Sequence, residues 1–262
     1  MQNMRVFDTH AHYDSGAFNA DRLEVLASMP EQGVELILNP GCELESSRTA
    51  VSLAERFPYV YAAVGFHPSD CGEFSDASVE ELRRLAAHPK VKAIGEIGLD
   101  YYWKENPPHE FQQAVFHRQL DLAEELGLPV IVHDREAHQD CLQIVRQHPN
   151  VTGVYHCYSG SLEDAKTLVK LGWMLSFTGV VTYKNARKSL EVIEWLPMDR
   201  IMIETDSPYL TPEPFRGKRN DSGKVHLVAE TIARAKGLSP EEVAQITLEN
   251  GKRFFNIQED MK

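Results

Sequence analysis

Histidine and acidic residues follow the first short apolar run of this sequence. The run ends in "DTHAH", which places Asp8, His10 and His12 at every second position. In an extended segment alternate side chains share one face, so these three side chains are expected to point the same way. Imidazole nitrogens and carboxylate oxygens are common ligands of divalent metal ions. The spacing therefore indicates a metal site at the end of this segment.

Polar residues of the same kinds end further apolar runs. A single histidine in such a place is more often structural, but repeated placement favours one shared site. Four imidazoles and two carboxylates suit two divalent cations, and Zn²⁺, Mn²⁺, Ni²⁺, Fe²⁺ or added Mg²⁺ all remain open. The polar residues at the ends of the runs, five histidines and four carboxylates in all, are His10, His12, His67, Glu96, Asp100, His133, His156, Glu204 and Asp206.

The remaining histidines lie elsewhere in the pattern. His88 and His148 each precede an apolar run, which predicts a position at the opposite rim from the metal site. The other four fall in helical or linking segments, and all six are predicted to be structural or solvent-facing. These four are His109, His117, His138 and His226.

Eight apolar runs alternate with amphipathic stretches along the chain. This order predicts one α/β domain over residues 1–262, a (β/α)₈ TIM-like barrel with extra C-terminal helices. An open doubly wound sheet is the alternative, but no Gly-rich phosphate loop follows the first run. Barrel active sites form at the C-terminal strand ends, where the polar residues stand. The predicted strands are 5–8, 34–41, 60–68, 92–100, 129–135, 151–160, 173–179 and 200–210.

Composition limits the kinds of partner. The 262 residues include 27 basic and 39 acidic ones, a net charge of −12, which argues against a module that grips nucleic acid through a basic face. A nuclease is compatible with this charge, because metal ions neutralise phosphates within a cleft. No signal peptide, membrane-spanning segment or obligatory protein partner is indicated. Four cysteines without CxxC spacing predict a reducing, cytoplasmic location.

Seven motifs in order resemble the TatD-type metal-dependent deoxyribonucleases of the amidohydrolase superfamily. They are "DTHAH", "GFHP", "GEIGLDYY", "VHDRE", "HCYSG", "ETDSPYL" and "PFRGKRN", and they span almost the whole chain. The resemblance implies a TIM-like barrel, dependence on divalent metals and hydrolysis of phosphodiester bonds in DNA. Residues 221–225, "DSGKV", depart from the acidic residue and proline that often follow in the family, which puts the shape of that loop in doubt.

The resemblance also implies a ligand set. His10, His12 and Asp206 would hold one metal ion, His133 and His156 the other, and Glu96 would stand between the two ions, where many superfamily members have a carbamylated lysine. Asp206 would also accept a proton from the attacking water. Glu204 and Asp100 are expected to hold imidazole N–H groups rather than metal.

Substrate contacts need cations or donors beside the metal ions. The matching motifs make His67, Arg135 and Arg216 the candidates, with Lys218 and Arg219 in the same loop as Arg216. The DNA substrate is expected to be single-stranded or to present ends. For Arg135 the alternative is an ion pair with Glu136 or with a neighbouring helix.

Three aromatic residues and one cysteine near the site have plainer interpretations. Tyr101, Tyr102 and Trp103 are predicted to form a hydrophobic lid over the barrel end, the alternative being a surface on which an unpaired base stacks. Cys157 is predicted to point away from His156 into the core.

Two other functions remain open at this point. The same ligands would serve an amidohydrolase acting on a small cyclic amide or ester. A non-enzymatic binding protein on a relic barrel is the third possibility, although the complete ligand set speaks against it.

Overall fold

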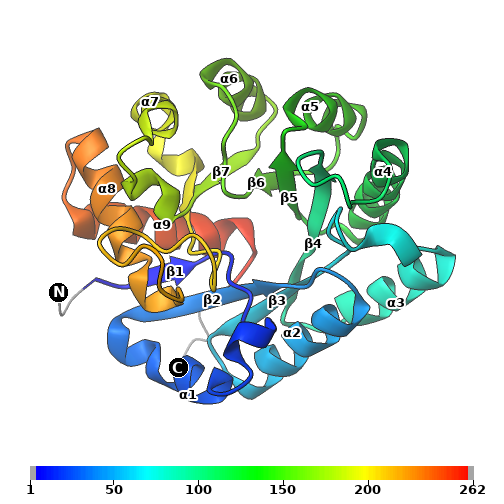
Figure 1. Cartoon of the computed structure of the whole chain (residues 1–262), viewed down its shortest axis with the longest axis horizontal. Helices are drawn as coiled ribbons and strands as arrows, with labels where there is room; N and C mark the ends of the chain where they lie inside the picture. Colours follow the sequence, from blue (N-terminus) through cyan, green and yellow to red (C-terminus); the bar gives the residue numbers. More distant parts are fainter. Residues whose placement is uncertain (1–3, 259–262) are drawn as a thin grey trace.

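The chain folds into a ring of eight parallel strands with helices outside it (Figure 1). The computed structural model describes residues 4–258. Each strand pairs with its neighbours in sequence, in the order β1 to β8. The predicted (β/α)₈ TIM-like class is therefore confirmed. The strands are β1 (Val6–Asp8), β2 (Val34–Pro40), β3 (Val60–Val64), β4 (Val91–Asp100), β5 (Val130–Arg135), β6 (Gly153–Tyr155), β7 (Met174–Phe177) and β8 (Ile201–Ile203).

Helices follow the strands one by one. The helix after β8 completes the eight units, and α9 is an additional C-terminal helix, as the sequence predicted. Gly127 and Gly237 end α4 and α8 in the left-handed conformation that glycine tolerates best. No helix among residues 4–258 has the length and apolar character needed to span a membrane. The helices are α1 (Arg22–Ser28), α2 (Leu44–Arg56), α3 (Asp76–Ala86), α4 (His109–Leu126), α5 (His138–Gln147), α6 (Leu162–Lys170), α7 (Arg187–Trp195), α8 (His226–Lys236) and α9 (Pro240–Phe254).

The core has two layers, because successive strand residues face opposite sides of the sheet. The larger layer lies between strands and helices. The smaller layer fills the barrel and receives Leu248 and Phe255 from the α9 segment, and Phe255 lies 5.9 Å from the Phe7 ring. Because α9 contacts β1 and β8, it covers the end of the barrel where the strands begin. The opposite end is left for polar residues.

The ring is joined between β1 and β8 by backbone beyond the two strands. The Thr9 nitrogen donates to the Ile203 carbonyl at 3.2 Å, the Asp206 nitrogen to the His10 carbonyl at 2.9 Å, and the His12 nitrogen to the Ser207 carbonyl at 2.7 Å. These bonds hold the two histidine positions of the first motif directly beside Asp206.

The end of the first strand corrects one expectation. β1 ends at Asp8, so the alternation that was expected to put Asp8 on the face of His10 and His12 stops there. The buried Asp8 carboxylate instead accepts from the Thr205 nitrogen at 2.8 Å and from the Thr205 hydroxyl at 2.5 Å. Asp8 therefore joins the ends of β1 and β8 and takes no part in the metal cluster.

An irregularity in β4 sets the direction of the Glu96 side chain, another residue of the site. The register with β5 shifts between Ile94 and Ile97, so that strand alternation is broken around Glu96. Bulges of this kind redirect side chains next to active sites. The Glu96 side chain, only 3% exposed, consequently enters the barrel mouth.

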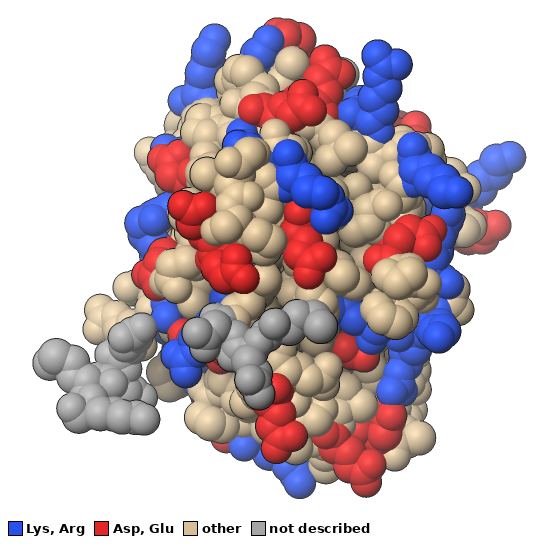
Figure 2. Space-filling model, turned by 90° about the vertical axis from the view of Figure 1, so that its left-hand side faces the viewer, with Lys and Arg blue, Asp and Glu red and all other residues tan. Residues whose placement is uncertain are grey.

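Surface charges of both signs alternate on the side of the molecule that Figure 2 presents, where Lys and Arg side chains stand among Asp and Glu. This side offers no extended basic face of the kind on which duplex-binding modules rely.

Replacing Asp8 by alanine is expected to weaken the β1–β8 junction. The buried Thr205 nitrogen and hydroxyl would lose their acceptor, so the free energy of unfolding should fall by about 2–4 kcal/mol. Urea unfolding followed by circular dichroism measures this. Asp199→Ala is the control, because Asp199 is exposed just before β8. Equal stability of the two variants would contradict a structural role for Asp8.

Candidate metal centre

Six side chains that the sequence singles out as metal ligands converge at the C-terminal ends of the strands. They come from five places in the chain: the segment after β1, β4, β5, the segment after β6, and the segment after β8. The side chains are those of His10, His12, Glu96, His133, His156 and Asp206. Each lies within a few ångströms of another member.

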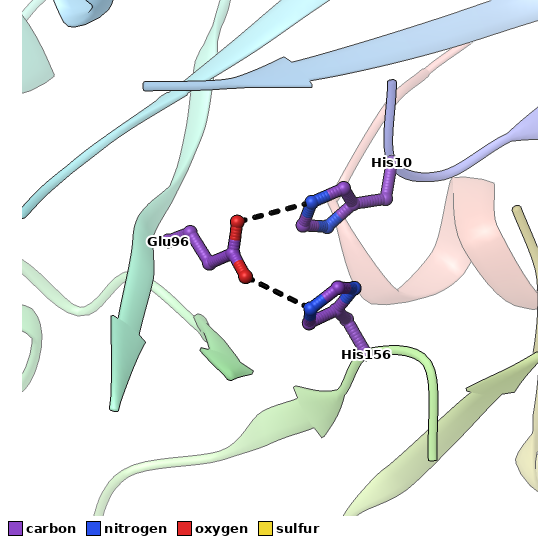
Figure 3. A group of neighbouring side chains, drawn as sticks. All are labelled: His10, Glu96 and His156. Carbon is purple, nitrogen blue, oxygen red and sulfur yellow. Dashed lines mark ion pairs between the residues drawn. The ribbon is translucent and has the colours of Figure 1, made fainter. Parts of the chain in front are cut away.

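Glu96 occupies the middle of the cluster. Its Oε1 lies 2.8 Å from His156 Nε2 and 2.9 Å from His133 Nδ1. Its Oε2 lies 3.2 Å from His10 Nε2 and 3.5 Å from His12 Nε2. Figure 3 shows one Glu96 oxygen turned toward His10 and the other toward His156, with both rings on the same side of the carboxylate. A carboxylate in this position can bridge two cations.

Asp206 closes one side of the cluster. Its Oδ1 lies 3.5 Å from His12 Nε2 and 3.8 Å from His10 Nε2, and the two imidazole nitrogens are 3.0 Å apart. Asp206 adopts a φ of 55°, in the left-handed region that Asp tolerates better than most residues. Such backbone conformations concentrate at functional sites. Three of the donors that were assigned together thus lie together.

Two further carboxylates orient histidine rings. Asp100 Oδ2 lies 3.1 Å from His133 Nε2, and Glu204 Oε1 lies 3.2 Å from His156 Nδ1. An imidazole that donates one N–H to a carboxylate presents its other nitrogen to a metal. Both rings therefore turn the free nitrogen toward Glu96, which matches the supporting role that the sequence predicts for Asp100 and Glu204.

His67 also reaches the cluster, with Nε2 at 3.8 Å from Glu96 Oε1. Its Nδ1 accepts a hydrogen bond from the Ser69 nitrogen at 3.1 Å. Burial and the neighbouring His133 lower the pKa of His67 to about 3, so the ring is neutral. With Nδ1 accepting, the single proton resides on Nε2, the nitrogen on the side of Glu96. The ring is therefore built to donate a hydrogen bond, and it brings no positive charge.

The two central carboxylates are ionised despite their burial. Desolvation opposes ionisation of Glu96, yet its interactions with His156 and His10 hold its pKa well below the usual range. Desolvation likewise acts on Asp206, and a hydrogen bond with His12 together with His156 and His10 lowers its pKa. Because a buried carboxylate needs a compensating cation, this centre demands positive charge.

Protonated imidazoles meet that demand without metal. Burial acts to lower the pKa of His12, His133 and His156, but nearby acidic groups outweigh it and raise the pKa of each. Burial and the charge of His156 lower the pKa of His10. Of the basic side chains among the described residues, only histidines lie within ion-pair distance of Glu96 and Asp206.

The donor set fits divalent metal ions. Two triplets of ligand atoms, one from His10, His12 and Asp206 and one from His10, Glu96 and His156, each lie within 4.8 Å of one another. Nitrogen and carboxylate oxygen together suit first-row transition metals. His10 Nδ1 is buried without a hydrogen-bond partner, so the ring depends for its contacts on the Nε2 side that faces the cluster.

Two cysteines near the centre differ from expectation. Cys42 Sγ lies 3.9 Å from His12 Nδ1, a contact that the sequence analysis missed although Cys42 stands just past the second apolar run. Cys157 was expected in the core, but its φ of 44° interrupts the strand alternation after β6. Its side chain is partly exposed and lies 3.4 Å from the Thr178 hydroxyl.

The candidate substrate contacts fall into two classes. Arg135 and Arg216 are exposed, make no ion pair among residues 4–258, and rest on aromatic rings. Arg219 instead forms an ion pair with Asp21 at 2.6 Å, so it is held away from any phosphate. The alternative of an Arg135–Glu136 ion pair is not realised.

The predicted aromatic lid is wrong for two of its three members. Tyr101 stacks on His109 at 3.6 Å and its hydroxyl donates to Asp140, as a packing residue does. Tyr102 and Trp103, however, are 51% and 52% exposed. Both rings contact the Arg135 guanidinium, at 4.0 Å and 5.5 Å, and about half of each side chain remains open to solvent.

The six histidines set aside by the sequence analysis stay outside the cluster, and each has another contact. These contacts are His88 with Glu55, His109 with Tyr101, His117 with His148, His138 with Asp134, and His226 with the Gly223 carbonyl.

Comparisons with known proteins agree with this geometry. The family model described as TatD related DNase matches residues 7–256. A Bacillus subtilis protein named an uncharacterized metal-dependent hydrolase is 43% identical, with 96% of this chain and 99% of that protein covered. A Salmonella typhimurium protein named a 3'-5' ssDNA/RNA exonuclease is 34% identical, with 96% and 99% covered. The crystal structure of a TatD homolog from Escherichia coli superposes with a TM-score of 0.91 at 34% identity, covering 97% and 99%.

Metal binding is expected to strengthen as pH rises from about 6 to about 8, because metal must displace protons from His12, His133 and His156. The raised pKa values of these three histidines favour their protonated forms at the lower pH. Titration calorimetry with Mn²⁺ in buffers of different ionisation enthalpy would count the protons released. His88→Gln should behave as wild type. Affinity that is independent of pH, with no proton release, would contradict the assigned ligands.

Proposed function

Because the chain belongs to the TatD related DNase family, we propose that it is a divalent-metal-dependent hydrolase that cleaves phosphodiester bonds in DNA. The observation that carries the proposal is the convergence of imidazole and carboxylate donors around Glu96, at the barrel end where active sites form. Relatives named as exonucleases of single-stranded nucleic acid support the choice of substrate.

We propose that two metal ions bind here. His10, His12 and Asp206 would hold one, His133 and His156 the other, with Glu96 between them. The donor set suits Zn²⁺, Mn²⁺, Ni²⁺ or Fe²⁺, with Mg²⁺ as a further candidate. When bound, such ions lower the pKa of a shared water and neutralise charge on the attacked phosphate.

Asp206 is the proposed acceptor of the water's proton. Its side chain is 15% exposed, against 3% for Glu96, so water and substrate reach it more readily. Its lowered pKa keeps it ionised and able to accept a proton near neutrality. Glu96, enclosed by imidazoles, instead serves to hold the two sides of the centre together.

Phosphate recognition falls to groups with free donors at the mouth. The guanidinium groups of Arg135 and Arg216 lie 4.0 Å from the Tyr102 ring and 4.3 Å from the Tyr183 ring, and no carboxylate competes for them among the described residues. An arginine fork fits phosphate oxygens in a bidentate manner. His67, with its proton on Nε2, would add one neutral donor.

The substrate strand is proposed to be single-stranded or to present an end. An overall charge of −12 gives no long-range attraction for duplex DNA, so binding rests on the few cations at the mouth.

A cytoplasmic location is proposed as well, since Cys42, Cys71, Cys141 and Cys157 are all free.

Hydrolysis of a small cyclic amide or ester needs the same metal centre, and no observation favours it. The unpaired arginines beside the centre match an anionic phosphodiester better than a neutral amide.

Metal-loaded protein is expected to hydrolyse single-stranded DNA and bis-p-nitrophenyl phosphate while leaving a panel of cyclic amides intact. His133→Ala should lower phosphodiester kcat/KM by at least about 100-fold. Loss of a residue that only supports a metal ligand costs up to about 100-fold, and loss of a ligand itself should cost at least as much. Rates are followed by gel analysis of a labelled strand and by release of p-nitrophenolate.

His88→Ala is the matched control, since His88 lies outside the cluster and contacts Glu55. Circular dichroism should show that both variants keep the fold. Hydrolysis confined to the amides would end the nuclease proposal, and full activity of His133→Ala would remove that residue from the centre.

A further inference from the structure

The loop after β4 presents two aromatic rings to solvent beside the metal centre. Tyr102 and Trp103 are 51% and 52% exposed, and their rings meet edge to face with centroids 4.8 Å apart. Large aromatic side chains on a surface usually mark a place where something binds. Because the two rings are nearly perpendicular, a planar ligand that stacks on one of them meets the other at its edge.

The loop is pinned to the barrel, so the rings are held in place. Asp100 Oδ1 accepts hydrogen bonds from the backbone nitrogens of Tyr102 at 3.0 Å and Trp103 at 3.3 Å. The Asn106 side chain donates to the Asp100 carbonyl at 3.1 Å. A fixed ring pays less conformational entropy when a ligand stacks on it.

The same carboxylate joins the rings to the metal centre. While its Oδ1 holds the loop, Asp100 Oδ2 lies 3.1 Å from His133 Nε2. The Tyr101 nitrogen also donates to the Arg135 carbonyl at 2.9 Å, which ties the loop to the end of β5. The Asp100 side chain thus links the aromatic patch directly to His133, a proposed metal ligand.

A cation completes the patch. The Arg135 guanidinium lies 4.0 Å from the Tyr102 ring centroid and 5.5 Å from that of Trp103. Arginine over an aromatic face is favourable and leaves the outward N–H groups free. In a nucleotide strand a planar base is joined through a sugar to a phosphate. The aromatic rings offer a site for the base, and the Arg135 guanidinium offers one for the phosphate.

We propose that Tyr102 and Trp103, with Arg135, form a platform on which one unpaired base next to the cut phosphodiester bond stacks. This inference rests on the proposed function and specifies how that site chooses its substrate. The platform requires a base that is free of its partner strand, because a paired base in a duplex has both faces covered by its neighbours. It explains a preference for single strands or frayed ends without any basic groove.

The test uses single-stranded oligonucleotides in which bases are replaced one at a time by abasic residues. For wild-type protein, one position beside the cut bond should lower kcat/KM by about 5- to 100-fold when its base is missing. The double variant Tyr102→Leu/Trp103→Leu should lose a similar factor on the complete strand. It should also lose the dependence on that base, so that both proteins cleave the abasic strand alike.

Trp195→Leu is the matched control. Trp195 is 40% exposed and has a lysine, Lys166, 6.0 Å from its ring, but it ends α7 ahead of β8 and lies toward the other end of the barrel. Its activity on every strand should equal that of wild type. Metal content, measured by atomic emission, should be the same in all three proteins.

Three results would overturn the platform alone: wild-type rates from the double variant on the complete strand, an unchanged response to the abasic position, or a loss of metal that accounts for the slower cleavage. A wild-type protein that hydrolyses bis-p-nitrophenyl phosphate or an amide but no strand would instead overturn the proposed function itself.

Discussion

The junction between the ends of β1 and β8 is the constraint on which the site depends. Backbone bonds from Thr9, His12 and Asp206 join the two segments, and the buried Asp8 carboxylate binds Thr205 across the same line. Only this closure brings residues almost 200 positions apart, such as Asp8 and Thr205 with a separation of 197, into one place. A sheet left open there would hold His10 and His12 at one edge and Asp206 at the other.

Charge balance then explains why the cluster has the composition it does. Burying Glu96 and Asp206 without positive partners would cost several kcal/mol for each charge. The structure supplies no Lys or Arg to either carboxylate within residues 4–258, and uses imidazoles, whose protons a metal can replace. Fixed cations sit outside this ring, on aromatic surfaces at the mouth. Under the proposed function, metal would replace protons at the imidazoles, and the arginines would stay available to substrate.

The sequence predicts the barrel well because its eight apolar runs alternate with stretches whose apolar residues recur at helical spacing. It also places the six candidate ligands, since the ends of parallel strands share one rim. What it misses depends on local backbone and on tertiary partners. Alternation fails at Asp8 because it was expected to continue past the end of β1 to His10 and His12, and at Cys157 because β6 already ends at Tyr155. Three features depend on contacts that no sequence spacing records. They are the Asp21–Arg219 ion pair, the exposure of Trp103 and the donor nitrogen of His67.

The central claim is that two cations share Glu96 at this end of the barrel. Anomalous diffraction from crystals of the protein grown with Mn²⁺ tests it most directly. Two strong peaks are predicted, one bounded by His10, His12 and Asp206 and the other by His133 and His156, both within bonding distance of the Glu96 carboxylate. Peaks elsewhere on the molecule, or none near Glu96 at saturating Mn²⁺, would contradict the account.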